Sequence, residues 1–386
     1  MNLRKSMKKI VCMLLTCTLL LSLAGCSSVR DTAGSAGQDV AEDSGNSGTH
    51  TVTDHLGNTV TVPNDIQRIA VCGIYPLPSV LAIFFDSAEK IVGMPTASMT
   101  AAKNSLLGQL YPDIMNANTS FYDGNTVNTE ELMKLNPDVV FYTASSPEVG
   151  EELTKAGFAA VAVSTNKWNY NSIETLDNWI DLLSQIFPDN DKTEIVRNYS
   201  NQIYDMVQQR VSGLSDSERA RVFFLFNYTD SAIATSGKSF FGQWWADAIG
   251  AKNVAEELTN DNSVRVNMEQ IYKWNPDTVF ITNFTTATPD DLYNNSVGSY
   301  DWTDIQAVAD KNVHKMPLGM YRSYTPGADT PVTLLWLAKT TYPDLFSDID
   351  ITAETKSYYK TVFGIDLTDE QADSIFAPVA AAGSGF

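Results

Sequence analysis

The chain contains an internal repeat, and this repeat constrains the fold more than any other feature of the sequence. Residues 128–145 and 267–284 align at a constant offset of 139, and nine of the 18 aligned positions are identical. The two segments read NTEELMKLNPDVVFYTAS and NMEQIYKWNPDTVFITNF. Each predicts a short helix, an Asn-Pro-Asp turn and a buried strand. The repeat therefore predicts two lobes that are structural copies of each other.

The segments around the repeat predict alternating strands and helices, which is typical of an α/β fold with parallel sheets. The expected elements are a hairpin at 51–63, strands at 68–71 and 90–94, and a helix at 79–85. Between the two copies, residues 173–211 carry apolar side chains at helical spacing, interrupted at 188–191. We expect two helices here, and the second is long enough to act as a rigid strut between the lobes.

The N-terminus has the layout of a bacterial lipoprotein signal. Four basic residues among the first nine precede an apolar run at 10–24, which at 15 residues is shorter than the ~20 needed to span a bilayer. The run ends in Leu-Ala-Gly before Cys26, a match to the lipobox. We expect residues 1–25 to be a signal peptide and Cys26 to carry the lipid that anchors the protein to the outer face of the cell membrane. Residues 26–49, rich in small and acidic residues, predict a flexible tether.

Composition excludes several classes of function. The chain has 46 acidic and 26 basic residues, a net charge of −20, and loss of four basic residues with the signal takes it to −24. Such a surface repels nucleic-acid phosphates, so no nucleic-acid partner is expected. The three histidines are too few for a multi-histidine metal centre, and no metal site is predicted. After cleavage and lipidation only Cys72, in an apolar run, remains as a thiol, so no disulfide is expected.

Motifs of catalysis are absent from the sequence. It contains no Gly-x-Ser-x-Gly elbow, Walker loop, His-Glu-x-x-His or CxxC pair. These absences favour a binding protein without a cofactor over an enzyme. The competing class is a lipid-anchored surface enzyme, such as a hydrolase or a metal-dependent lyase.

Several short motifs in a fixed order resemble the helical-backbone class of ABC-importer substrate-binding proteins. They are the lipobox, the tether, D-x-x-G-x-x-V-x-V-P at 54–63, Arg68-Ile69, the two N-P-D-x-V units and GAKNVA at 250–255. The resemblance implies two pseudo-symmetric α/β lobes joined by a long rigid helix, with the ligand in a cleft between them. It also implies a monomer that delivers its ligand to a permease dimer with ATPase subunits. The expected boundaries are 50–172 and 213–386 for the lobes and 173–212 for the connecting helices.

Candidate ligand-binding residues lie where predicted strands end, because open parallel sheets bind ligands at their carboxyl ends. They are Tyr75, Tyr122 and Trp168 in the first lobe and Tyr228, Lys238, Phe240, Tyr321, Arg322 and Tyr324 in the second. An aromatic residue at such a position more often packs in the core than contacts a ligand, and a surface salt bridge explains a lone cation equally well.

Two cations on presumed cleft loops favour an anionic ligand, since a guanidinium chelates carboxylates and oxyanions. In this family the ligand is a ferric siderophore, haem, cobalamin or an oxyanion. We expect a ferric siderophore-type complex, with haem, molybdate or tungstate, and cobalamin as alternatives. Direct binding of Fe(III) by the tyrosines beside Arg322 is a further alternative, and aromatic lining of a chelate site is favoured over it.

The repeat also suggests a docking surface. Glu130 and Glu269 occupy equivalent positions, each two residues after the Asn that begins a short helix, on the side away from the apolar residues. Both should be exposed. Favourable placement in the first helical turn would explain an acid at either position. The family resemblance implies instead that one glutamate per lobe meets arginines of the permease.

Overall fold

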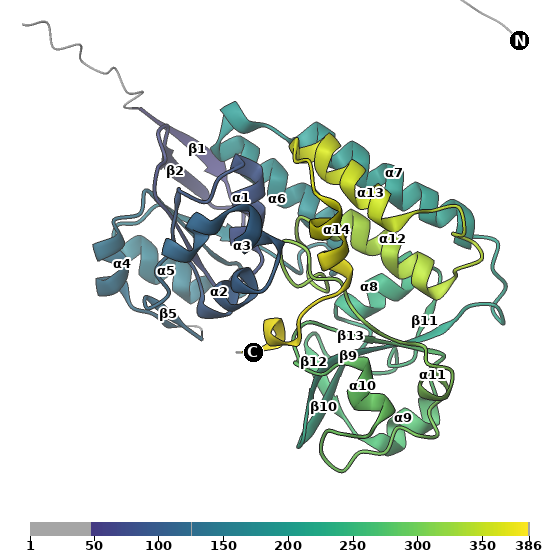
Figure 1. Ribbon diagram of the computed structural model, residues 1–386. Coiled ribbons are helices and arrows are strands. Elements are labelled where there is room, and N and C mark those ends of the chain that lie inside the picture. Colours follow the sequence, from purple (N-terminus) through teal and green to yellow (C-terminus); the bar gives the residue numbers. More distant parts are fainter. Residues whose placement is uncertain (1–47, 125, 385–386) are drawn as a thin grey trace, which may run out of the picture. The chain divides into compact units, whose positions relative to one another are not determined.

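The structure is a computed structural model that describes residues 48–124 and 126–384 (Figure 1). The predicted signal peptide, the lipidation site Cys26 and nearly all of the predicted tether lie outside the described residues. Within the described part of the chain, no helix is both long and apolar enough to cross a membrane.

The first lobe is built on a four-stranded parallel sheet with the strand order β4-β3-β7-β8. The predicted hairpin is present as the antiparallel pair β1-β2. The elements are β1 (Thr49–Thr53), β2 (Thr59–Pro63), β3 (Ile69–Cys72), α1 (Leu77–Phe85), β4 (Ile91–Gly93), α2 (Thr96–Lys103), α3 (Leu106–Leu110), η1 (Pro112–Asn116), β5 (Tyr122–Asp123), β6 (Thr126–Val127), α4 (Thr129–Leu135), β7 (Val139–Thr143), α5 (Pro147–Lys155) and β8 (Ala160–Val163). Cys72 is buried in β3 as a free thiol, as the sequence predicted.

The second lobe has a mixed sheet with the order β12-β10-β9-β13-β14, and β11 also pairs with β9. Its elements are β9 (Arg221–Thr229), β10 (Ala232–Ser236), α8 (Phe241–Ala248), β11 (Lys252–Asn253), β12 (Ser263–Val266), α9 (Met268–Trp274), β13 (Thr278–Ile281), α10 (Pro289–Tyr293), α11 (Gln306–Ala309), β14 (Val313–Lys315) and α12 (Thr330–Thr341). Strands β11, β9, β13 and β14 are mutually parallel in the same order as β4, β3, β7 and β8. The two lobes are therefore pseudo-symmetric, and the antiparallel strands β10 and β12 are an addition to the second.

The Asn-Pro-Asp motif has the same role in both lobes. Asn136 and Asn275 end helices α4 and α9 in the left-handed conformation, at φ +43° and +41°, which asparagine tolerates better than most residues. The next residue, proline, disfavours continuation of a helix, and the aspartate then binds the start of the neighbouring strand. The Oδ2 atom of Asp138 accepts a hydrogen bond from the Arg68 amide at 2.8 Å. The Oδ2 atom of Asp277 likewise accepts one from the Arg221 amide at 2.9 Å.

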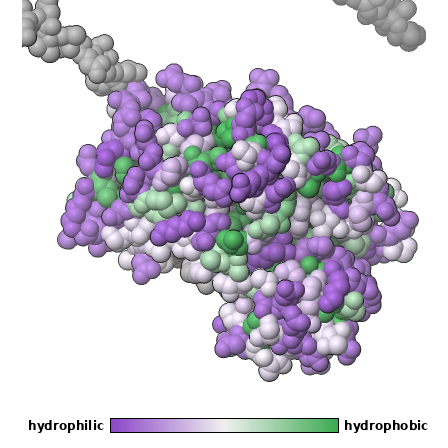
Figure 2. All heavy atoms as spheres, viewed as in Figure 1, coloured by the Kyte–Doolittle hydropathy of each residue, from purple (hydrophilic) through white to green (hydrophobic). Residues whose placement is uncertain are grey.

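Two helices connect the lobes, as the sequence predicted. They are α6 (Ser172–Ile186) and α7 (Thr193–Val211), separated by a short 3-10 turn, η2 (Pro188–Asn190). At 19 residues α7 is about 28 Å long. Its buried side chains contribute to the cores of both lobes: Val196 packs with the first, and Ile203, Val207 and Val211 with the second. Figure 2 shows one face of the molecule, on which hydrophilic residues predominate and hydrophobic ones are scattered.

The last part of the chain, which the sequence analysis assigned to the second lobe (213–386), packs against the core of the first. This part comprises α13 (Ile351–Tyr358), the π-helical turn η3 (Tyr359–Phe363), α14 (Asp369–Phe376) and η4 (Ala380–Gly383). Residues such as Tyr358, Phe363 and Ile375 belong to the same hydrophobic core as Leu81 and Phe141 of the first lobe. The sequence repeat ends at residue 284 and carries no information on this segment.

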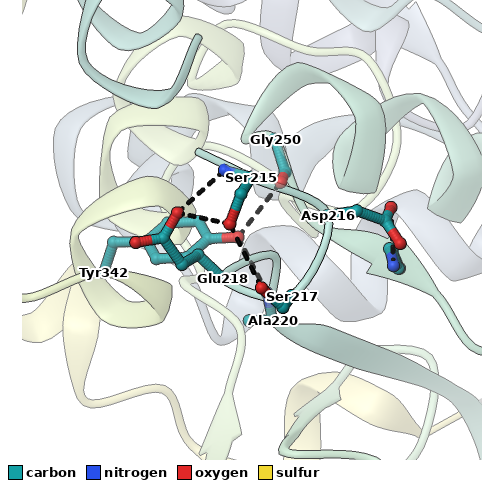
Figure 3. A network of polar contacts seen from close by, with 8 residues as sticks. Ser215, Asp216, Ser217, Glu218, Ala220, Gly250 and Tyr342 are labelled. Carbon is teal, nitrogen blue, oxygen red and sulfur yellow. Dashed lines mark hydrogen bonds and ion pairs between the residues drawn. The ribbon is translucent and has the colours of Figure 1, made fainter. Parts of the chain in front are cut away.

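A network of polar contacts holds the junction between α7 and the second lobe (Figure 3). The Tyr342 hydroxyl accepts a hydrogen bond from the Ala220 amide at 3.0 Å and donates one to the Gly250 carbonyl at 3.1 Å. In the adjoining turn, Glu218 accepts hydrogen bonds from the Ser215 amide at 2.9 Å and hydroxyl at 2.6 Å. An ion pair between Asp216 and Lys252 at 2.8 Å adds a further link. Three segments distant in sequence are thus fixed where the strut ends.

Substitution Tyr342→Phe should lower the free energy of unfolding by about 1 kcal/mol, because two backbone groups lose a partner in a partly buried place. Urea denaturation followed by circular dichroism measures this change. Tyr204→Phe is the matched control, since Tyr204 packs against the same core and its hydroxyl has no hydrogen-bond partner among the described residues. Equal stability of the two variants would contradict a stabilising role for the junction.

Candidate functional site

A cavity of about 390 Å³ is lined by residues from both lobes. Its lining residues are Gly73, Tyr75, Pro76, Thr143 and Thr165 from the first lobe and Phe226, Phe240, Phe241, Asn262, Ser263, Phe284, Tyr321 and Thr325 from the second. Gly73 directly follows β3, Thr143 ends β7 and Thr165 comes two residues after β8. In the second lobe, Phe284 comes three residues after β13. The cavity therefore lies at the carboxyl ends of parallel strands of both sheets, where the sequence predicted the ligand site.

The second lobe contributes an aromatic wall to this cavity. The rings of Phe226 and Phe284 stack, with centroids 5.0 Å apart and an interplanar angle of 22°. Phe240 lies 5.8 Å from Phe226 and 4.9 Å from Phe241. These contacts make a continuous apolar surface that suits the organic part of a ligand.

The polar groups of the lining are neutral. They belong to two tyrosines, three threonines, Ser263 and Asn262, and none of the described residues that line the cavity has a charged side chain. Burial raises the pKa of Tyr321 to about 12 and also raises the pKa of Tyr75. Both phenols are therefore protonated near neutral pH. The Tyr75 hydroxyl can donate a hydrogen bond to a ligand oxygen, whereas the Tyr321 hydroxyl is itself buried.

Gly73 brings the first-lobe wall close to the cavity. Its φ is +75°, and a Cβ atom here would lie 2.7 Å from the Tyr122 hydroxyl and 3.0 Å from the Thr143 Cγ2 atom. Only glycine satisfies both the conformation and the packing. Tyr122, a predicted ligand residue, thus lies behind Gly73 and supports the wall from outside the lining.

Tyr228 does not reach the cavity, and a β-bulge explains why. Pairing between β9 and β10 shifts so that Phe226 is the extra residue on β9. After the bulge, Tyr228 shares the face of Phe223 and Leu225 and joins their core. There its hydroxyl accepts a hydrogen bond from Trp302 Nε1 at 2.9 Å. The sequence analysis placed Tyr228 after the end of a predicted strand, whereas β9 continues to Thr229.

Neither predicted cation lines the cavity. Lys238 is exposed, and its backbone amide donates a hydrogen bond to the Leu258 carbonyl at 2.6 Å. Arg322 is fully buried and donates to the Ala382 carbonyl from Nε at 3.0 Å and from Nη2 at 2.7 Å. Its guanidinium also lies 5.0 Å from the centre of the Phe284 ring. Arg322 therefore links the aromatic wall to the C-terminal turn, and the two cations no longer argue for an anionic ligand.

The structure brings three of the predicted ligand residues, Tyr75, Phe240 and Tyr321, into the lining. Tyr324 is buried behind the aromatic wall, with its ring 5.7 Å from Phe226 and its hydroxyl bonded to Ser236. Trp168 lies outside the lining and packs edge-on against His55 at 5.0 Å. It follows β8, but the chain turns away from the cavity after Thr165 to begin α6.

The sequence interpretation missed most of the aromatic wall. The side chain of Phe226 faces the cavity because of a bulge that leaves no signal in the sequence. Phe241 was not among the predicted ligand residues, although its neighbour Phe240 was. Phe284 follows a strand of the repeat and replaces Ser145 of the first copy, a difference that could have drawn attention to it.

Larger hollows lie elsewhere on the described part of the molecule, and two of them are as follows. One, of about 680 Å³, lies between β2 and α5, and the other, of about 720 Å³, between β14, α12 and the segment after α14. Neither is lined by the carboxyl ends of strands from both lobes. Among the described residues, no group of three or more histidine, cysteine or carboxylate side chains is arranged to hold a metal ion.

Comparisons with known proteins agree with this architecture. The chain is 26% identical over 340 residues to the molybdate-binding protein MolA of Haemophilus influenzae, a match that covers 83% of this chain and 93% of that protein. A periplasmic solute binding protein from Veillonella parvula superposes with a TM-score of 0.76 at 30% identity, covering 86% and 97% of the two chains. Helicobacter pylori CeuE with Ni(II) bound superposes with a TM-score of 0.69 at 22% identity over 85% and 99%, which shows a shared fold.

A family model described as periplasmic binding protein matches residues 78–318, well over half of the chain. Proteins of this family bind solutes for transport across the membrane and are not enzymes. The match spans both lobes and the connecting helices, and it agrees with the resemblance found in the sequence. The chain belongs to the periplasmic binding protein family.

Proposed function

We propose that this solute-binding protein captures a metal chelate of the ferric siderophore type in the cavity between its lobes. The protein then delivers the chelate to an ABC permease dimer driven by ATPase subunits. Lipid on Cys26 would keep it at the outer face of the membrane. The observation that carries the choice of ligand is the lining, in which an aromatic wall faces neutral hydroxyl donors.

The chemistry of the lining supports a ligand with an organic surface. Stacked rings such as those of Phe226 and Phe284 bind flat or apolar groups, for example the aromatic rings of a catecholate chelator. The hydroxyls of Tyr75 and Thr143 can donate hydrogen bonds to the oxygen atoms that surround a chelated metal. Because no lining side chain carries charge, the metal keeps the ligands that it brings with it.

Molybdate is a second candidate, favoured by the name of the Haemophilus influenzae relative. A tetrahedral oxyanion is much smaller than a cavity of about 390 Å³ and offers no surface to an aromatic wall. Molybdate binding would therefore require the lobes to close further around the ion. Haem and cobalamin are larger than the cavity and would require the lobes to open, and a hexadentate ferric siderophore of similar mass to haem would require the same opening.

Ligand identity is tested by native mass spectrometry of protein purified from its own host, followed by titration with the species found. In parallel, tryptophan fluorescence is followed during titration with a ferric tris-catecholate, a ferric hydroxamate, haem, cobalamin, molybdate and ferric nitrilotriacetate. The proposal expects saturable binding of a ferric chelate. Recovery of a sugar or an amino acid, or binding of molybdate alone, would overturn it.

Substitution Phe240→Ala should weaken binding of the ferric chelate about tenfold, because it removes one ring from the wall and opens the cavity to water. Phe240 is half-buried, so the fold should tolerate the change. Phe158→Ala is the matched control, a half-buried ring at the hollow near α5. Equal affinities of the two variants in isothermal titration calorimetry would show that the ligand does not contact this wall.

A further inference from the structure

The turn that leads from β8 into α6 has a disfavoured backbone. Asn169 and Tyr170 lie in succession in the left-handed region, at φ +52° and +60°. Asparagine adopts this conformation readily, whereas a bulky residue such as tyrosine does so only where surrounding contacts hold it. The turn is closed by the Asn171 amide donating to the Trp168 carbonyl at 2.9 Å. Asn171 then caps α6 by accepting a hydrogen bond from the Glu174 amide at 3.0 Å.

This conformation directs Tyr170 onto the second lobe. Its ring centroid lies 5.4 Å from that of Phe240 and 5.0 Å from that of Phe241, with edge-to-face geometry in both cases. Its hydroxyl donates a hydrogen bond to the Asp261 carbonyl at 2.7 Å. Phe240 and Phe241 line the cavity, and Asp261 directly precedes the lining residues Asn262 and Ser263. Tyr170 therefore contacts two separate lining segments from the start of the connecting helices.

We infer that Tyr170 is a positioning residue for the ligand site, and the inference rests on the proposed function of this cavity. Tyr170 holds the segments 240–241 and 261–263 against the first-lobe side without lining the cavity itself. Each of its contacts must break before those segments can move away from α6. The residue therefore controls how fast a bound ligand leaves, and it affects the rate of entry less.

The test compares Tyr170→Phe and Tyr170→Ala with the matched pair Tyr272→Phe and Tyr272→Ala. Tyr272 is an exposed tyrosine on α9 whose hydroxyl also donates to an aspartate carbonyl, that of Asp301, at 2.6 Å. Stopped-flow fluorescence measures dissociation of a ferric tris-catecholate. Tyr170→Phe, which loses one hydrogen bond, should raise the dissociation rate about fivefold. Tyr170→Ala, which also loses two aromatic contacts, should raise it about thirtyfold, and the Tyr272 variants should match the wild type.

Hydrogen exchange in the ligand-free protein gives a second readout that does not depend on the ligand. In Tyr170→Phe, amides at 261–263 should exchange faster while those at 240–241 stay near the wild type. In Tyr170→Ala both segments should exchange faster, with an unchanged urea midpoint. If the wild type and the Tyr272 variants bind none of the chelates, the proposed function fails and exchange alone decides the role of Tyr170. The inference would be overturned if Tyr170→Ala showed wild-type hydrogen exchange at both segments. It would also be overturned if the chelate left Tyr170→Ala as slowly as it leaves the wild type.

Discussion

Replacement of both Glu130 and Glu269 by lysine is expected to abolish ligand uptake by cells while ligand affinity in solution stays unchanged. Both side chains are exposed in the structure, as the repeat predicted, and each lies in the first turn of its helix. On α4 the ion pair of Lys134 is with Glu131, so the pair leaves Glu130 available to a partner. A permease built from two similar subunits would present one basic site to each glutamate. Reversal of both charges would then turn two attractions into two repulsions.

The repeat adds an apolar component to the proposed docking surface. Met133 and Tyr272 occupy equivalent positions at the offset of 139, three residues after the glutamates on the same helical faces. With exposed fractions of 51% and 43%, they are two of the six exposed large hydrophobic residues in the described part of the chain. An exposed apolar side chain beside an acid in both copies supports the interpretation of each face as an interface.

The control for this experiment carries the same change of charge elsewhere. Glu148 and Asp290 are exposed acids in the first turns of α5 and α10, one in each lobe, and they are not related by the repeat. The variant Glu148→Lys/Asp290→Lys should support normal uptake. Uptake of radiolabelled ferric chelate by cells that carry the importer is the measurement. Wild-type uptake by the Glu130→Lys/Glu269→Lys variant would refute the assignment of these residues to docking.

The sequence was sufficient to predict the architecture where short-range patterns determine it. The repeat located α4, β7, α9 and β13 correctly because the Asn caps, the Asn-Pro-Asp turns and the buried strands all depend on neighbouring residues. The break at 188–191 likewise separated α6 from α7, since proline there disfavours a continuous helix.

The binding site was predicted less well, because its lining depends on contacts between distant segments. Because of the bulge in β9, Phe226 lines the cavity in place of the predicted Tyr228. The bulge arises from the pairing of β9 with β10, a segment outside the strand itself. The Ala382 carbonyl that accepts hydrogen bonds from Arg322 lies 60 residues further along the chain, in the turn η4. A pattern of strands and loops indicates where such residues lie along the chain. It does not indicate which way their side chains point.

Asp329 should make the stability of the protein depend on pH in the direction opposite to ordinary acid denaturation. This carboxyl is buried between the loop that carries Tyr321 and the π-helical turn. It accepts hydrogen bonds from the Met320 amide at 2.7 Å and from the Tyr359 hydroxyl. Burial outweighs these hydrogen bonds and raises the pKa of Asp329 from 3.8 to about 6. A Cβ atom at Gly319 would lie 2.1 Å from Oδ1, so no side chain fits beside the carboxyl.

The folded state therefore binds the Asp329 proton more tightly than the unfolded state does. The stability that the protonated carboxyl contributes is complete below pH 4 and is lost as the pH rises through 6. A pKa change from 3.8 to about 6 corresponds to about 3 kcal/mol between pH 4 and pH 8. The variant Asp329→Asn has no titrating group at this position. Its stability relative to the wild type should therefore increase by about 3 kcal/mol as the pH rises from 4 to 8. Other buried titrating groups, such as His55, are common to both proteins and cancel in the difference.

Urea unfolding of the wild type and Asp329→Asn at several pH values between 4 and 8 measures this difference. Asp369→Asn provides a control of opposite sign, because the hydrogen bond and charge of Lys356 lower the pKa of Asp369. In that variant, the stability relative to the wild type should stay nearly constant between pH 4 and pH 8 and should rise only as the pH falls below 4. If instead the difference between Asp329→Asn and the wild type is the same at pH 4 and pH 8, Asp329 is ionised in the folded protein throughout this range. The loop that carries Tyr321 would then be held by a buried carboxylate and not by a carboxylic acid.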